Sequence, residues 1–98
     1  IGLTKTVALE VAELGITVNA ICPGYVWTPI VEKQLDDQVR VHGIPKEKVI
    51  SDIMLAPQPT RRFIRIEEVA QVALNLADEA AGQINGAAMV IDGGWTAR

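Results

Sequence analysis

The residues best suited to chemistry lie in one short segment, residues 23–28. Pro23 cannot donate a hydrogen bond to a sheet, and Gly24 permits backbone angles that other residues avoid, so this pair ends the apolar run 16–22. That run is rich in Ile, Val, Thr and Cys and too short for a helix, which predicts a strand buried on both faces. Ligands of open α/β sheets bind at the carboxyl ends of such strands. We therefore predict a ligand-binding loop at 23–28.

Thr28 at the end of this loop and Gln34 beyond it are candidates for ligand contacts. Thr28 precedes Pro29, and this pair predicts a helix with Thr28 as its N-cap. A helix N-terminus also favours phosphate, so capping and ligand binding at Thr28 can coexist. Gln34 lies on the polar side of that helix, where its amide either donates to a carboxylate or faces solvent. Trp95 follows the turn 92–94, where packing at the chain end is the interpretation from position alone.

The elements that must position these residues follow the order helix, strand, helical region, helix, strand. Apolar spacing predicts long helices over 1–14 and 66–78, and a second buried strand over 87–91. The region 29–63 contains two short helices without a strand pattern, one from Pro29 to about residue 40 that breaks at 42–43, and one that starts at Pro45 and ends at 56–59. We interpret this region as a substrate-covering lobe, with ordinary core packing as the alternative. Two strands do not make a stable sheet, so the predicted α/β fold is incomplete on its own.

Length and composition narrow the class of protein. Ninety-eight residues form one small domain, and 49% hydrophobic against 21% charged residues is unusually apolar for that size, which indicates an oligomer or a piece of a larger protein. A net charge of −3 argues against nucleic acid as a partner. No apolar run is long enough to cross a membrane, and the single Cys22 is consistent with a reducing compartment, so we expect a cytoplasmic protein. We expect no metal site.

An ordered set of motifs resembles the short-chain dehydrogenases/reductases. The motifs are a strand end with the pattern N-A-x-x-P-G, a Thr four residues after its Gly, and a D-G-G turn after the last strand: residues 19–24, Thr28 and 92–94. The whole of 1–98 is similar to the last third of that family's single domain. The resemblance implies the C-terminal portion of a Rossmann-type, doubly wound parallel sheet that carries a nicotinamide cofactor.

The resemblance also implies roles for particular residues. Pro23, Gly24, Val26 and Thr28 would bind the cofactor, with the Val26 backbone N–H and C=O on the carboxamide. The cofactor is expected to be NAD, with NADP left open because the residue that distinguishes them lies outside these motifs. The helix 1–14 resembles the one that continues from the family's catalytic Tyr-x-x-x-Lys.

Three further segments carry a narrower resemblance: residues 31–34 after Thr28-Pro29, residues 54–55 with 58–60 and Phe63, and the ending 92–97. They are similar to the D-3-hydroxybutyrate dehydrogenases of that family, in which Gln34 would hold the substrate carboxylate and Trp95 would line the pocket. This implies oxidation of a small 3-hydroxy acid. In the wider family the last helix and strand commonly form part of a tetramer interface, so we expect a homotetramer of the full-length protein, with a dimer left open. The catalytic Ser, Tyr and Lys of the family pattern do not occur here, since Tyr25 is not followed by Lys at the required spacing, so we expect this stretch alone to be inactive. The alternatives are another family dehydrogenase, such as an oxoacyl reductase or sugar dehydrogenase, and a non-catalytic assembly module.

Overall fold

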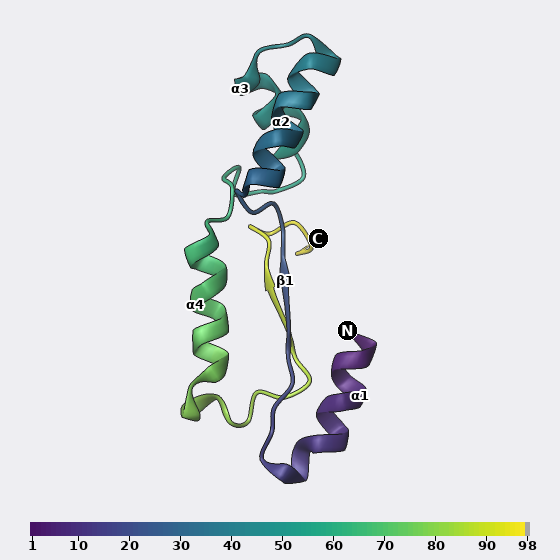
Figure 1. The fold of residues 1–98 in the computed structure, drawn as a ribbon, viewed down its shortest axis with the longest axis vertical. Helices are drawn as coiled ribbons and strands as arrows, with labels where there is room; N and C mark the ends of the chain where they lie inside the picture. The colour runs from purple at the N-terminus through teal and green to yellow at the C-terminus, as the bar shows by residue number, and fades with distance from the viewer. Residues whose placement is uncertain (98) are drawn as a thin grey trace. The chain divides into compact units, whose positions relative to one another are not determined.

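The structure is a computed structural model that describes residues 1–97. Its contacts divide the chain into two compact units, the first formed by Ile1–Cys22 with Glu67–Val90 and the second by Pro23–Ile66 with the residues from Ile91 onward. Two strands, β1 (Ala20–Pro23) and β2 (Ala88–Ile91), pair with each other (Figure 1). The pairing is parallel, because Ala20 N–H donates to Ala87 and Gly24 N–H to Ile91 at a constant offset.

The first unit contains both long helices of the sequence pattern. α1 (Gly2–Val11) runs into the short 3₁₀ turn η1 (Ala12–Leu14), and α4 (Ile66–Ala77) into η3 (Glu79–Ala81). Gly15 ends the first helical stretch at φ 74°, the left-handed conformation that a glycine adopts without a steric penalty. Both helices therefore form where the apolar spacing predicted them.

The strand predicted over 16–22 is shorter at its start than expected, because β1 begins only at Ala20. Two side-chain amides replace the regular ladder before that point. Asn85 Oδ1 accepts from Val18 N–H at 3.0 Å, and Asn19 Oδ1 accepts from Ala87 N–H at 3.0 Å. A segment whose backbone groups bond to side chains has no need of strand pairing, so the prediction for 16–19 was wrong.

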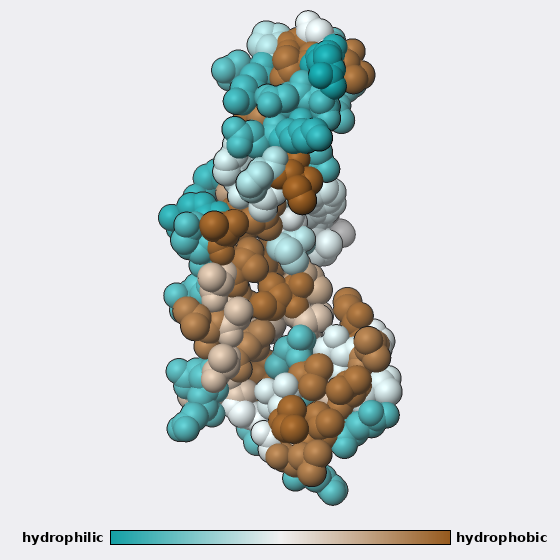
Figure 2. Space-filling view, in the orientation of Figure 1, coloured by the Kyte–Doolittle hydropathy of each residue, from teal (hydrophilic) through white to brown (hydrophobic). Residues whose placement is uncertain are grey.

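Large apolar side chains remain uncovered in the first unit. Leu3 is 77% exposed and Leu9 is 79% exposed, and Leu74 and Val90 are also exposed. Figure 2 shows the resulting apolar surface over α1. These faces account for the unusually apolar composition, because in residues 1–97 much of the apolar side-chain area is not buried.

The second unit holds the helical region. α2 (Pro29–His42) ends at Gly43, and α3 (Lys46–Val49) continues into the π-helical turn η2 (Ile50–Met54). α2 and α3 pack against each other (Figure 1) around a small core of Leu35, Val49 and Met54. Both helices occur where the sequence predicted them, and their apolar stripes form this core.

Candidate functional site

The predicted loop 23–28 lies entirely within the second unit, and its backbone is held by two neighbouring segments. Val26 forms an isolated parallel bridge with Ile64, in which Ile64 N–H donates to Tyr25 at 2.8 Å and Trp27 N–H donates to the Ile64 carbonyl at 2.9 Å. Along an extended chain the N–H and C=O of successive residues alternate sides. The N–H and C=O of Val26 therefore face away from Ile64. Within residues 1–97 neither group has a protein partner.

Gly24 is required by packing. A Cβ built at this position would stand 2.5 Å from Gln58 Oε1 and 3.1 Å from both Cα and Cβ of Asp92. Gly24 is absent from the residues with positive φ, so the unusual backbone angles expected there do not occur. The missing side chain makes room for neighbours within the protein, and a direct contact of Gly24 with a cofactor stays a prediction.

Gln58 is the residue that sequence reasoning missed. It is fully buried, its Oε1 accepts from Tyr25 N–H at 3.0 Å, and its Nε2 donates to the Arg62 carbonyl at 2.5 Å. Its side chain also fills the space left by a second glycine, Gly93. A buried amide needs partners for both ends, and here both partners are backbone groups. The sequence signals at this position were a glutamine between two prolines at 57–59 and a place in the segment 58–60 that carries the narrower resemblance, and neither indicated a buried side chain.

Thr28 caps α2 as predicted. Its Oγ1 accepts from Val31 N–H at 3.3 Å, and Pro29 occupies the first helical position. The hydroxyl proton is not used in that bond. Thr28 can therefore cap the helix and donate to a ligand oxygen at the same time.

The turn after β2 is built around Asp92. Its carboxylate is buried and accepts from Gly94 N–H, from Thr96 N–H and from the Thr96 hydroxyl, the last at 2.7 Å. The Thr96 hydroxyl, with smaller contributions from the backbone donors, holds the pKa of Asp92 below its ordinary value of 3.8, although burial acts in the opposite direction. The carboxylate thus stabilises a turn in which Gly93 and Gly94 both have positive φ.

Trp95 lies beside the loop through an aromatic contact. Its ring centroid is 5.8 Å from that of Tyr25, which in turn lies 6.4 Å from Phe63. Phe63 is 5.0 Å from Trp27, so the four aromatic residues of the chain form one connected row. Trp95 remains 38% exposed, which leaves part of its ring available for a ligand.

Gln34 stands apart from this group. It lies on the exposed side of α2, one residue before the buried Leu35, and no hydrogen bond joins it to the loop or to Trp95. Pro23 is the exposed last residue of β1. The structure therefore brings together Gly24, Val26 and Trp95 through Gln58 and Tyr25, whereas Gln34 is held only by its helix.

Within residues 1–97, no three His, Cys, Asp or Glu side chains gather in a way that would hold a metal ion. No helix of that stretch combines the length and apolar character needed to cross a bilayer.

Comparison with protein families and curated proteins gives matches along nearly the whole chain. A family model described as enoyl-(acyl carrier protein) reductase matches residues 1–96. A D-beta-hydroxybutyrate dehydrogenase of Rhizobium meliloti (strain 1021) is 62% identical over 97 residues, which are 99% of this chain and 38% of that protein. The chain therefore spans about two fifths of the length of this relative.

Solved structures match over the same span. A short chain dehydrogenase family protein from Francisella tularensis superposes with a TM-score of 0.91 at 28% identity, over 99% of this chain and 40% of that one. A putative 2-deoxy-D-gluconate 3-dehydrogenase from Agrobacterium tumefaciens with bound NADP superposes with a TM-score of 0.80 at 38% identity, over 99% of this chain and 35% of that one. The predicted α/β class and the parallel strands are confirmed, and the matched region is only part of these folds.

Proposed function

Because the chain belongs to the short-chain dehydrogenase/reductase family, we propose that the protein containing it oxidises D-3-hydroxybutyrate to acetoacetate with NAD as hydride acceptor. Membership makes it a part of an oxidoreductase. The finer assignment rests on one observation, the 62% identity to a D-beta-hydroxybutyrate dehydrogenase across 97 residues. The substrate, the choice of NAD and the activity of the whole protein are proposals, as are the homotetramer and the cytoplasmic location.

The loop 23–28 fits a nicotinamide carboxamide. The unpartnered N–H and C=O of Val26 form an adjacent donor and acceptor on one side of the chain, which is the complement of an amide. Thr28 can donate its hydroxyl proton beside the N-terminus of α2, where negative charge is stabilised. When bound, the dinucleotide supplies the hydride chemistry; these residues only hold and orient it.

The substrate carboxylate would be held by Gln34 and enclosed by Trp95. The Gln34 amide can donate two hydrogen bonds and is exposed on α2, in the helical region that we propose as a substrate-covering lobe. The partly exposed ring of Trp95 supplies apolar surface beside Tyr25. Excluding water at this place would strengthen the contact with the carboxylate.

The test is an absorbance assay of NADH formation by the full-length protein. We expect turnover with D-3-hydroxybutyrate and NAD, and much slower turnover with the L enantiomer, 2-deoxygluconate and 3-hydroxyacyl thioesters. Preference for a sugar acid or a thioester would favour another dehydrogenase of the family. Absence of turnover with every substrate and with both NAD and NADP would favour the assembly module.

A further inference from the structure

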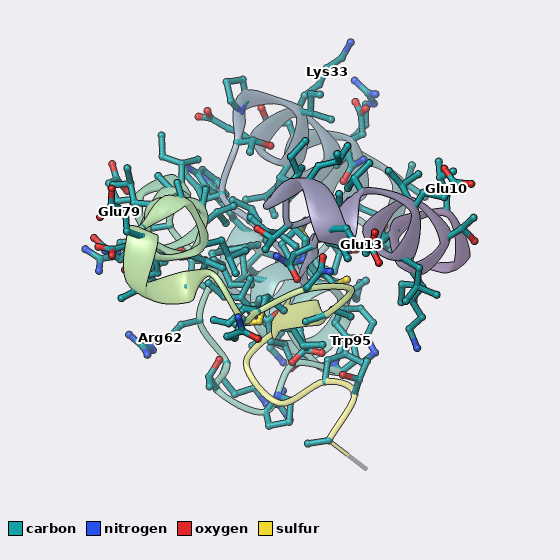
Figure 3. The ribbon with its side chains drawn as sticks, turned by 90° about the horizontal axis from the view of Figure 1, so that it is seen from below. Glu10, Glu13, Lys33, Arg62, Glu79 and Trp95 are labelled. Carbon is teal, nitrogen blue, oxygen red and sulfur yellow. The ribbon has the colours of Figure 1, made fainter. Side chains whose placement is uncertain are left out.

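The buried side chain of Gln58 connects three segments of the second unit. Its amide bonds to Tyr25 in the loop after β1 and to the Arg62 carbonyl in the turn that follows it. Its Cγ lies where a Cβ of Gly93, in the turn after β2, would be only 2.8 Å away. The side chain is thus enclosed at the carboxyl ends of both strands. Figure 3 shows the Arg62 side chain extending away from the ribbon, and Gln58 donates to the Arg62 backbone carbonyl.

Three successive peptide planes of the loop are each held by one hydrogen bond. Ile64 holds the two planes on either side of Val26, through the Tyr25 carbonyl and the Trp27 N–H. Gln58 holds the plane before them, through Tyr25 N–H. That plane follows Gly24, whose backbone rotates more freely than that of any other residue. Without Gln58, the peptide plane between Gly24 and Tyr25 would have no hydrogen bond. The direction of the two planes around Val26 depends on that plane, because they follow it in the chain.

Burying an amide is costly when an apolar side chain could fill the same space. Gln58 is 0% exposed, and its hydrogen bonds go to loop and turn backbone outside any helix or strand. Its contribution is therefore to the orientation of these segments. On the basis of the cofactor binding proposed above, we propose that Gln58 is a positioning residue that orients the Val26 backbone toward the nicotinamide carboxamide.

Gln58 should affect binding of the nicotinamide end of the dinucleotide and leave binding of the ADP-ribose end unchanged. This difference provides the test. ADP-ribose lacks the nicotinamide, so it does not reach the groups that Gln58 orients. The experiment is calorimetric titration of the full-length protein with NADH and with ADP-ribose, in the wild type and in Gln58→Met. If the wild type prefers NADPH, that ligand and 2′-phospho-ADP-ribose replace the pair.

We expect Gln58→Met to weaken NADH binding about tenfold, the loss typical of one buried hydrogen bond, and to change ADP-ribose binding less than twofold. Gln71→Met is the matched control, since Gln71 is exposed on α4 and bonds only to Asn75. It should change neither affinity. Equal weakening of both ligands, or of neither, in Gln58→Met would overturn the proposal.

Gln58→Glu gives a second, independent measurement if the methionine variant does not fold. Its carboxylate accepts from Tyr25 N–H but donates to the Arg62 carbonyl only when protonated. NADH affinity in this variant should therefore rise as the pH falls from 8 to 6, with the wild type flat over that range. A flat profile in Gln58→Glu refutes the positioning role. Failure of the wild type to bind any dinucleotide refutes instead the proposed function.

Discussion

Replacing Gly24 with alanine tests the packing at the end of β1. The new Cβ would stand 2.5 Å from Gln58 Oε1, a separation at which one of the two atoms must move. The amide cannot move freely, because it is fully buried and bonded at both ends. Movement of Asp92 is no easier, since the 3.1 Å contacts there are with its Cα and Cβ.

The expected cost follows from these contacts. Overpacking a tight interior costs about 1–3 kcal/mol. Displacing the Gln58 amide adds about 1 kcal/mol for its hydrogen bond to Tyr25 N–H. Gly24→Ala should therefore lower the free energy of unfolding by about 2–4 kcal/mol in total.

The assay is urea denaturation of the full-length protein followed by circular dichroism. Gly2→Ala is the control, because a Cβ there meets nothing within 4 Å and Gly2 begins α1, so its stability should stay equal or rise by up to about 1 kcal/mol. In a Gln58→Ala background the penalty of Gly24→Ala should fall by at least about 1 kcal/mol, because the two side chains then no longer overlap. A Gly24→Ala loss below about 1 kcal/mol, or full additivity with Gln58→Ala, would refute the packing interpretation.

Three other substitutions in the full-length protein test the remaining parts of the site. Thr28→Ala should cost about 1 kcal/mol in urea denaturation through loss of the cap on Val31 N–H, and Thr28→Ser should restore most of it. Gln34→Ala should raise the KM for D-3-hydroxybutyrate about tenfold without lowering Tm, because an exposed amide would lose only its bond to a charged carboxylate. Asp92→Asn should lower the urea midpoint at pH 7 by removing the charged acceptor of Thr96. A difference in urea midpoint between variant and wild type that stays constant down to pH 3 would contradict this. The folded-state pKa of Asp92 is depressed, so its stabilisation is present above the ordinary value of 3.8 and is lost as the pH falls through the folded pKa.

Local chemistry explains which elements the sequence predicted well. Thr28 and Pro29 start α2, and Gly43 at φ 63° ends it at the expected break. Each of these signals acts within one turn of the residue that carries it. β2 was likewise expected over 87–91 and occurs at Ala88–Ile91, where the turn at 92–94 stops it.

Long-range contacts explain what the sequence did not predict. Strand 16–22 was overestimated because Asn19 and Asn85, distant in the chain, replace its first ladder bonds with side-chain bonds. The burial of Gln58 depends on the space beside Gly24 and Gly93, two glycines that end different strands. No periodicity carries such information, since each of these residues lies in a loop or at a strand end.

Different residues position the proposed cofactor-binding and substrate-binding groups, so substitutions at them should change different affinities. In our proposal Gln58 orients the loop and hence the dinucleotide, whereas Gln34 is positioned by α2, which packs on the core around Leu35. Trp95 contacts Tyr25, the residue whose N–H Gln58 accepts, and it also presents an exposed edge. Changes at Trp95 should therefore alter both affinities, and changes at Gln58 or Gln34 mainly one each, because Trp95 contacts the loop through Tyr25 and is also proposed to enclose the substrate.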